Sequence, residues 1–268
     1  MAKDDYLFQR VAGWNRPILR LYEWDRPTLS LGRNQRIAGA IDADACARGG
    51  VTLVRRMTGG WAVLHGADLT YSVIAPVAPG RFGETILSTY RAIADAFLDL
   101  FRGLGYAPSL HSHTGRERAE RASPICFQTP AACELLMDGK KLIGSAQRRR
   151  PEAFLQHGSI PHRPQHALLA SLFPGATEEG VADTMTDLES IGLWRRLPRG
   201  AFRARLLASF ERALEARFAP APWSDADEEA VREGESRYAP LDPTGARAGA
   251  EPAAAPPVSA GRAAGEVV

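Results

Sequence analysis

Several features of membrane, secreted and metal-binding proteins are missing from this sequence of 268 residues. No apolar run approaches the roughly 18 residues that a membrane span needs, and the N-terminal segment MAKDDYLFQR lacks the apolar core of a signal peptide. The three cysteines, Cys46, Cys126 and Cys133, are an odd number without CxxC spacing, which argues against a disulfide framework and a zinc site. We therefore expect a soluble, cytoplasmic protein without a metal site.

A large excess of charge of one sign is also missing. The formal net charge is only +2, which is too small to indicate nucleic acid binding, and a hydrophobic fraction of 45% is that of a globular protein. Lysine is rarer still, because only Lys3, Lys140 and Lys141 contribute to the 33 basic residues and the remaining 30 are arginines. A lysine pair inside a glycine-containing motif is therefore less easily explained as surface filler.

Hydrophobic periodicity predicts an α+β domain that begins with strands. Alternating apolar and polar positions predict two short strands joined by a turn, followed by three further β-rich runs. The expected strands cover 17–24, 28–32, 51–56, 61–65 and 69–76. Apolar residues at intervals of three and four then predict an amphipathic helix over 84–104 that covers one face of the sheet.

The following part of the chain is expected to form another strand pair and then to turn helical. The runs ACELLMDGKKLIGSAQRRR and AFLQHGSIPH predict strands, the first with a hairpin turn at Asp138 and Gly139. Thr186, three residues before Glu189, matches a capping box and predicts the start of a helix. Further helices are expected over 201–218 and 224–238.

The C-terminal segment differs in composition from everything before it. From about residue 240 the sequence is rich in Ala, Pro and Gly, with almost no large apolar side chain whose burial would offset the entropy of ordering. We therefore expect a folded domain over 1–239 and a disordered Ala/Pro/Gly-rich tail over 240–268.

The segment RRMTGGWAVLH, residues 55 to 65, allows two interpretations. It can be a tight turn whose glycines adopt positive φ and whose arginines are solvated. It can also be a cradle for an anion or an acyl carbonyl, in which Gly59 and Gly60 let backbone N–H groups approach a ligand, Thr58 adds a hydroxyl, and Arg55 or Arg56 adds a forked cation. The spacing is not that of a Walker A motif.

The segment GKKLIGSAQ also has a structural and a functional interpretation. It can be a hairpin turn with surface lysines. Alternatively, Lys141 begins a strand with its ammonium in a pocket, where it polarises a carbonyl and stabilises the oxyanion that forms on attack. Gly144 and Ser145 would then let a substrate pass close to the backbone.

Among the cysteines, Cys126 has the most unusual setting. Most free cysteines are inert and buried, and Cys46 and Cys133 look like packing residues of this kind. Cys126 lies in SPICFQTP, a loop rich in Ser, Pro and Thr, which makes exposure more plausible.

The histidines do not indicate a metal site. His65 and His157 end or interrupt apolar runs, where a histidine is more often a hydrogen-bonded structural group than a ligand. His111 and His113 are close in sequence, but no further ligands have convincing spacing. We predict no metal site.

The motifs RRMTGGWAVLHGADLTYS, GKKLIGSAQRRR and LQHGSI occur in this order and together resemble the biotin/lipoate protein ligase superfamily. The resemblance is to its lipoate-protein ligase and octanoyltransferase branch, and it covers about residues 4 to 238. It implies a class II aminoacyl-tRNA synthetase/biotin-lipoate ligase-like domain of class α+β, with a largely antiparallel mixed sheet flanked by helices. An octanoyl or lipoyl chain would lie in an apolar tunnel.

The resemblance also implies roles for individual residues. Lys141 would contact the acyl carbonyl. The residues implied in substrate binding are Arg55, Arg56, Thr58, Gly59, Gly60, His65, Gly144, Ser145, Gln147, His157 and Gly158. Cys126, fifteen residues before Lys141, falls where the octanoyltransferases of the Gram-positive type keep their nucleophilic cysteine.

The implied activity is that of an octanoyl-[acyl carrier protein]:protein N-octanoyltransferase in lipoate biosynthesis. An octanoyl group on acyl carrier protein would pass through a thioester on Cys126 to the lysine of a lipoyl-accepting domain, the glycine cleavage H protein or a 2-oxoacid dehydrogenase E2. No cofactor would be required, since a thioester already carries the activation. Both partners would be acidic, and Arg148, Arg149 and Arg150 could steer them unless they are simply solvated.

Two alternatives stay open. One is an ATP-dependent lipoate-protein ligase, which would need ATP and Mg²⁺, or an amidotransferase that moves octanoyl or lipoyl groups between domains. Trp61 stands where the ligases have a third glycine, and its bulk is expected to crowd a nucleotide there. The other is a noncatalytic acyl-domain binding protein, which the presence of Lys141 makes less attractive.

Overall fold

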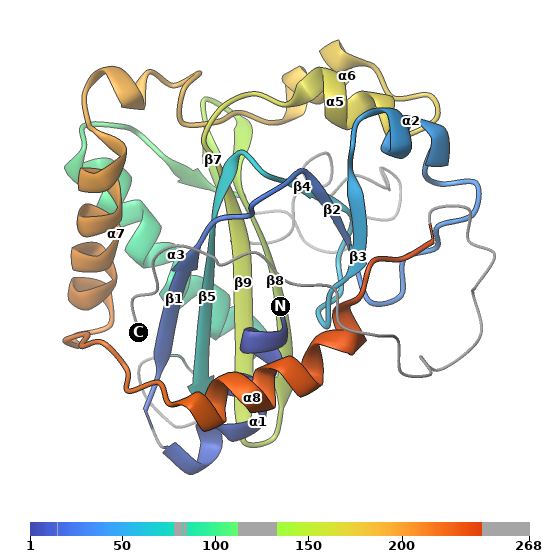
Figure 1. Ribbon diagram of the computed structural model, residues 1–268. Coiled ribbons are helices and arrows are strands. Elements are labelled where there is room, and N and C mark those ends of the chain that lie inside the picture. The colour runs from blue at the N-terminus through green and yellow to red at the C-terminus, as the bar shows by residue number, and fades with distance from the viewer. Residues whose placement is uncertain (15, 78–81, 83–84, 112–132, 243–268) are drawn as a thin grey trace.

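The computed structural model describes residues 1–14, 16–77, 82, 85–111 and 133–242 (Figure 1). Its main sheet has six strands, all paired antiparallel, in the spatial order β1-β5-β9-β8-β7-β6. These strands are β1 (Ile18–Tyr22), β5 (Asp68–Pro76), β9 (Ala153–Pro161), β8 (Lys140–Arg150), β7 (Leu135–Met137) and β6 (Ser109–Leu110). The expected α+β class with a largely antiparallel sheet is confirmed.

A second, smaller sheet has the order β3-β2-β4 and is mixed. Strand β2 (Thr28–Leu31) pairs parallel with β3 (Thr52–Arg55) and antiparallel with β4 (Val63–His65). The two strands expected at 17–24 and 28–32 therefore belong to different sheets. The segment between β3 and β4 joins two strands that flank β2, so it is not a hairpin turn.

Three short helices cover the small sheet. They are α2 (Ala43–Arg48), α5 (His166–Ser171) and α6 (Glu178–Thr184), and Figure 1 shows them above its strands. Their apolar side chains form one core with Leu29, Leu53 and Leu64 of the sheet, and Trp61 packs against this core. Whether Trp61 hinders a nucleotide stays a prediction.

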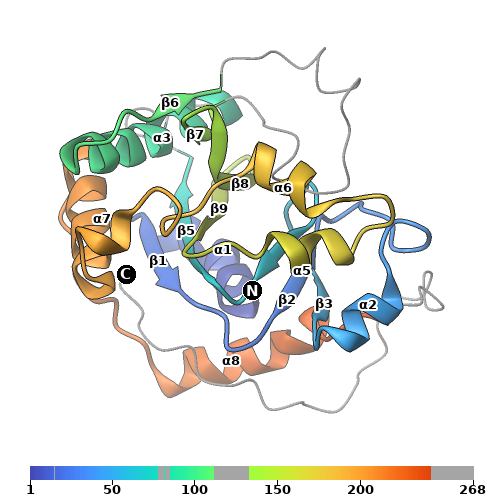
Figure 2. The ribbon, with the colours of Figure 1, turned by 90° about the horizontal axis from the view of Figure 1, so that it is seen from above.

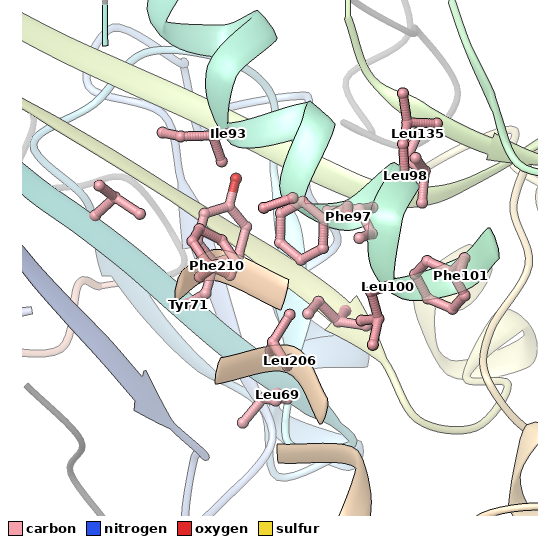
Figure 3. Packing of buried hydrophobic residues seen from close by; sticks show 14 of the residues in the cluster. Leu69, Tyr71, Ile93, Phe97, Leu98, Leu100, Phe101, Leu135, Leu206 and Phe210 are labelled. Carbon is pink, nitrogen blue, oxygen red and sulfur yellow. The ribbon is translucent and has the colours of Figure 1, made fainter. Parts of the chain in front are cut away.

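One face of the main sheet is apolar and is covered by two helices. Alternate residues of β1 and β5, among them Leu21, Leu69 and Tyr71, pack against α3 (Ile86–Gly103) and α7 (Arg199–Ala213) (Figure 3). Helix α3 begins at a capping box formed by Thr85 and Ser88. The helix expected over 84–104 is confirmed, as is its position over one face of the sheet.

The opposite face of the main sheet is polar although it is buried. The alternation that directs Leu21 and Tyr71 toward α3 and α7 directs their strand neighbours the other way. The buried polar residues of this face are Arg20, Tyr22, Asp68, Thr70, Ser72, His157 and Ser159. Seen from above, α3 and α7 lie on one side of the main sheet and the small sheet lies on the other (Figure 2). A buried polar surface of this kind requires hydrogen-bond partners, and it is therefore the place to look for a site.

The end of this polar face is closed by the N-terminal helix. Helix α1 (Ala2–Trp14) places Leu7, Phe8 and Val11 against Ile74 and Leu155 of the sheet. Helix α8 (Asp225–Glu235) begins at a capping box formed by Ser224 and Asp227, and the 3-10 turn η3 (Ser236–Tyr238) follows it. The acidic helix expected over 224–238 is therefore confirmed.

The helix predicted to start at Thr186 is wrong. The backbone N–H of Thr186 donates to the carbonyl of Lys141 at 3.0 Å, so this residue pairs with β8 instead of capping a helix. Asp187 caps the turn that follows, because its Oδ1 accepts from the N–H groups of Glu189 and Ser190. A short 3-10 turn, η2 (Leu193–Arg195), then leads into α7, which ends at Ala213 instead of extending to residue 218.

The expected tail lies mostly outside the described residues. At its start, the N–H of Leu241 donates to the carbonyl of Leu53 in β3 at 2.8 Å, and its side chain packs against the small-sheet core. Of the helices within the described ranges, none combines the length and apolar character needed to cross a membrane.

Candidate functional site

A cleft lies between the polar face of the main sheet and the small sheet. Its free volume is about 30 Å³, room for about two water molecules, so an acyl chain would have to displace lining side chains. The lining residues beyond Met1 are Tyr22, Trp24, Ser30, Arg56, Val63, His65, Thr70, Gly144, Ser145, Ala146, His157, Gly158 and Ser159. Six residues that the sequence predicted for the site, from four separate segments, thus meet at one cleft.

His65 is held on both ring nitrogens. Its Nδ1 lies 2.8 Å from Oδ2 of Asp68 and its Nε2 lies 2.8 Å from the hydroxyl of Ser30. The ring of Trp24 stacks on the imidazole, with centroids 4.3 Å apart, and its Nε1 donates to Thr70. This network fixes the orientation of both aromatic rings at one end of the cleft.

Asp68 holds this hydrogen-bond network in place. Its carboxylate also accepts from the hydroxyls of Ser159 and Thr70 and from the N–H of Gly66. Burial acts to raise the pKa of Asp68, but His65 and these hydrogen bonds outweigh it and hold that pKa below its usual value. The carboxylate is therefore charged at neutral pH.

Arg56 organises the loop between β3 and β4. Its guanidinium donates to the carbonyls of Ser30, Gly59 and Trp61 at 2.7 to 2.8 Å, and Nε donates to the hydroxyl of Thr58. Three carbonyl acceptors on one buried fork fix the path of the loop. Arg56 lines the cleft, but these contacts are structural, and its role as a substrate ligand stays a prediction.

Thr58 connects this loop to the main sheet. Its hydroxyl lies 2.7 Å from Nε2 of His157 in β9. Burial lowers the pKa of His157 to about 3, so the ring is neutral at physiological pH. A neutral imidazole can accept or donate a hydrogen bond here, but it adds no positive charge to the cleft.

Arg55 lies outside the cleft lining. Its guanidinium donates to the carbonyls of Gly32, Arg33 and Gln35 and so holds the segment that follows β2. Burial lowers the pKa of Arg55, and the site role predicted for it stays a prediction.

The two loop glycines differ in what they meet. Gly60 has a φ of +88°, which favours glycine. Its carbonyl approaches Gly32 so closely that a Cβ on Gly32 would lie 1.9 Å from the carbonyl oxygen of Gly60. Around Gly59 no atom lies within 4 Å of the position a Cβ would take. Of the two, Gly59 has the open space that a ligand close to the backbone would need.

Ser145 and Gln147 face the apolar side of the main sheet. The hydroxyl of Ser145 lies 2.7 Å from that of Tyr71, and Gln156 donates to the same tyrosine. Gln147 donates to Gln156 at 3.0 Å, and its Oε1 has no hydrogen-bond partner among the described residues. The structure therefore places Gln147 outside the cleft, whereas Ser145 lies at its edge.

Gly158 is required by the packing of the sheet. A Cβ there would lie 2.5 Å from the Tyr71 ring and 2.6 Å from the carbonyl of Gly144. The glycine in LQHGSI is thus explained by close approach inside the fold, and its predicted contact with substrate stays a prediction.

Lys141 is completely buried. Its Nζ lies 2.7 Å from Oε2 of Glu134, whose side chain is 1% exposed. Asp138 and Gly139 both have positive φ, as in a tight hairpin turn, and Lys140 points elsewhere and donates to the carbonyl of Ala182. Lys141 is therefore not a solvated turn residue, and it lies on β8 three residues before cleft-lining Gly144.

The predicted nucleophile Cys126 lies outside the described residues, as does His113. Cys46 is buried in the small-sheet core, as predicted, and burial raises the pKa of its thiol. Cys133 is half-buried with a φ of 65°, and burial raises the pKa of its thiol as well. Within the described ranges, no three His, Cys, Asp or Glu side chains come together as a metal site would require.

The arginine run at the end of β8 packs against the protein. The guanidinium groups of Arg148 and Arg150 lie over the ring of Phe8, and Arg149 donates to the hydroxyl of Thr89. These contacts fix the strand to α1 and α3, so they give the run a structural role besides the steering role predicted for it.

Sequence reasoning missed several residues of the site. They are Trp24, Ser30, Asp68, Tyr71, Glu134 and Gln156. Only Asp68 had a local signal, since it follows His65 by three residues in the motif HGAD. The others line the cleft or contact predicted residues through tertiary packing, which no local pattern reveals.

The fold is an α+β domain with a cleft between its two sheets, and sequence comparison places it in a family. Residues 1–211 match the family described as the lipoyl protein ligase A/B catalytic domain. The chain belongs to this family.

Curated relatives carry the description Octanoyltransferase LipM. The protein from Geobacillus kaustophilus is 42% identical over 178 residues, covering 65% of this chain and 64% of the relative. The one from Macrococcus caseolyticus is 40% identical over 165 residues, covering 60% of each chain, and the one from Exiguobacterium sp. is 36% identical over 217 residues, covering 79% of each. The chain thus spans about three fifths of the length of several relatives.

Solved structures share the fold. A putative lipoate protein ligase from T. acidophilum with bound lipoic acid has a TM-score of 0.70 at 21% identity, covering 87% of each chain. A lipoate-protein ligase A bound with ATP has the same TM-score and identity, covering 87% of this chain and 86% of the other. At this level of identity the likeness establishes the fold alone.

Proposed function

We propose that this protein is an octanoyl-[acyl carrier protein]:protein N-octanoyltransferase. It takes an octanoyl group from the thioester of acyl carrier protein and delivers it to the lysine of a lipoyl-accepting domain. The observation that carries the proposal is about 40% identity to octanoyltransferases in a chain whose motif lysine, Lys141, is buried, paired with Glu134 and on the same strand as cleft-lining Gly144.

The proposed chemistry proceeds in two transfers. The thiolate of Cys126 attacks the acyl carbonyl, a carbon–sulfur bond to Cys126 forms, and the bond to the carrier breaks as the carrier thiol leaves. The acceptor lysine amine then attacks this acyl-enzyme and loses a proton, an amide forms, and the Cys126 thiolate leaves. Because a thioester is exchanged for a thioester and then for a more stable amide, no nucleotide is needed.

Lys141 would act on the carbonyl oxygen in both steps. Each attack builds negative charge on that oxygen, and a fixed ammonium in a site without bulk water stabilises it more than it stabilises the ground state. Glu134 would hold the ammonium in place and offset the cost of burying it. The neighbouring cleft, with Trp24 stacked on His65, would receive the acyl chain.

The acceptor would be a lipoyl-accepting domain such as the glycine cleavage H protein or a 2-oxoacid dehydrogenase E2. An archaeal structural neighbour at 20% identity is described as a bipartite lipoate protein ligase with its E2 lipoyl domain, which supports an acceptor of this kind. The octanoyltransferase relatives support octanoyl-carrier protein as the donor.

The proposal is tested by weighing the intact protein after incubation with octanoyl-carrier protein in the absence of ATP. We expect one octanoyl adduct that hydroxylamine removes, absent in Cys126→Ala and retained in Cys133→Ser. An unmodified wild-type protein would contradict the mechanism. A ligase is indicated instead if free octanoate with ATP modifies the acceptor domain faster than octanoyl-carrier protein does.

A further inference from the structure

A second cleft lies where helix α7 begins, away from the acyl cleft. Its volume is about 350 Å³, and its lining includes Glu23, Leu69, His162, Trp194, Arg199 and Arg203. Figure 1 shows α7 beside β1, at the flank of the main sheet.

The cleft has an excess of positive charge. Arg203 pairs with Glu23 at 2.9 Å, whereas no carboxylate in the described residues pairs with Arg199, whose guanidinium lies 5.4 Å from the ring of Trp194. The first turn of α7 contains no acidic residue, and no side chain caps it. Arginine at a helix N-terminus opposes the helix dipole, so this arrangement does not stabilise α7.

His162 supplies the second, independent observation. Its side chain is only 6% exposed, and it lines the cleft. Trp194 lies edge-on to its ring and donates to its backbone carbonyl, but neither ring nitrogen has a hydrogen-bond partner among the described residues. The ring nitrogens are not among the fully buried atoms, so they face the cleft, where a ligand can hydrogen-bond to them.

The donors around the cleft suit a phosphate group. Two arginines, an imidazole and Gly200 in the uncapped first turn of a 15-residue helix line it. Helix N-termini and arginine forks both favour the tetrahedral oxygens of phosphate, which accept several hydrogen bonds at once. Glu23 neutralises Arg203 in part, and the net charge of the cleft stays positive because of Arg199.

This cleft and the cleft between the two sheets, called the acyl cleft here, lie at the same end of the main sheet but on its opposite faces. Glu23 lines the cleft at α7 and Trp24 lines the acyl cleft. The same holds on β5, where Leu69 lines one and Thr70 the other. An extended substrate that passes around this end of the sheet would place its acyl group in the first cleft and an anion in the second.

We propose that the cleft at α7, formed around His162, Arg199 and Arg203, binds the phosphate ester of the donor's prosthetic arm. This inference rests on the proposed function, because the thioester of an acyl carrier protein is carried on a phosphopantetheine arm. The shared chemistry is a phosphate ester, and a nucleotide is the other source of such a group.

The test is a binding measurement that requires no turnover. The full chain is titrated with 4′-phosphopantetheine and, separately, with pantetheine, while the His162 ring resonance is followed by NMR and assigned with His162→Gln. We expect 4′-phosphopantetheine to shift this resonance and to bind at least about tenfold more tightly than pantetheine. Arg199→Ala should weaken binding of the phosphorylated compound by at least about tenfold.

Arg205→Ala is the matched control. Arg205 is exposed on the same helix and does not line the cleft. Its replacement removes the same charge as Arg199→Ala, but it should leave binding nearly unchanged. Equal losses at Arg199 and Arg205, or equal binding of the two compounds, would overturn the proposal. Tighter binding of ATP than of 4′-phosphopantetheine at His162 would overturn the assignment to the donor arm. Failure of the proposed transferase activity would appear separately, as the absence of the octanoyl adduct on Cys126.

Discussion

At the scale of single residues, burial changes what the motif side chains can do. Lys141 and Glu134 form an ion pair whose side chains are 0% and 1% exposed. Removing two charges from water costs several kcal/mol each, and mutual attraction recovers this only in a well-fixed geometry. A charge kept here at such a cost is better explained by chemistry than by stability.

The role of Lys141 is tested with a double variant in which uncharged side chains replace both members of the ion pair with Glu134. Lys141→Met alone leaves Glu134 as an unpaired buried charge and should destabilise the protein by about 3–5 kcal/mol. We expect Lys141→Met combined with Glu134→Gln to restore the melting temperature while turnover stays lowered by about a hundredfold, because an oxyanion donor is lost. Both are measured by thermal unfolding and by octanoyl transfer.

Lys140→Ala serves as the control for the preceding experiment. Lys140 donates to the carbonyl of Ala182, so its loss should cost about 1 kcal/mol of stability and leave turnover nearly unchanged. Wild-type turnover in the neutral Lys141 and Glu134 double variant would show that the lysine is only structural.

His157 gives a prediction about pH. Its pKa is lowered by burial from about 6.5 to about 3, so between these values the unfolded state binds a proton that the folded state does not. The free energy of unfolding should therefore fall as pH decreases through this window, by up to about 1.4 kcal/mol per pH unit from this residue. Urea unfolding at pH 7, 6 and 5 should show a shallower decline in His157→Gln, and parallel curves would argue against a buried neutral imidazole.

At the scale of elements, the segment between β3 and β4 is the feature that shapes the site. Arg56 fixes it through three carbonyls, Thr58 ties it to β9, and the carbonyl of Gly60 is packed against Gly32. The presence of glycine at these two motif positions therefore has two different physical reasons. Gly60 needs its backbone conformation and its close approach, whereas Gly59 borders open space.

Two alanine substitutions separate these reasons. Gly32→Ala places a Cβ 1.9 Å from a backbone oxygen and should destabilise the protein by about 3 kcal/mol or more. Gly59→Ala meets no atom within 4 Å and should leave stability within about 0.5 kcal/mol of wild type. If the loop backbone contacts the acyl head group, Gly59→Ala should still lower turnover by about tenfold or more, as measured by steady-state kinetics. Unchanged turnover would remove Gly59 from the site.

At the scale of the whole molecule, the main sheet separates an apolar layer from a layer of buried polar groups. Its apolar face meets α3 and α7, and its polar face meets the small sheet and α1 (Figure 2). The cleft between the two sheets lies in the second layer, where each buried polar group has to find a partner. The apolar core and this cleft thus lie on opposite faces of the same strands.

The boundary of the folded part is tested by two truncations. Deleting residues 243 to 268 should leave the melting temperature and turnover nearly unchanged, because the sequence there has few groups that could anchor it. Deleting from residue 240 also removes Leu241, its bond to Leu53 and its packing, and should lower the melting temperature by a few degrees. A large loss from the shorter deletion would show that the tail docks on the domain.

Local patterns in the sequence were sufficient for the elements that repeat over many residues. The periodicity of α3, the alternation of β5 and the turn at Asp138 and Gly139 each determine structure through neighbours in the chain. They were less reliable for short signals, as the capping box at Thr186 shows. The backbone N–H of Thr186, which would stay free at a helix start, instead donates a tertiary hydrogen bond to the carbonyl of Lys141.

What the sequence by itself determined is the class of fold, the family motifs and the candidate residues within them. What only the tertiary structure decided is their geometry: that Lys141 meets Glu134, that His65 lies between Ser30 and Asp68, and that Gln147 turns away from the cleft. The physical reason is that periodicity acts between residues a few positions apart. Pairing of distant strands, which brings Thr58 to His157, depends on burial and register across the whole chain.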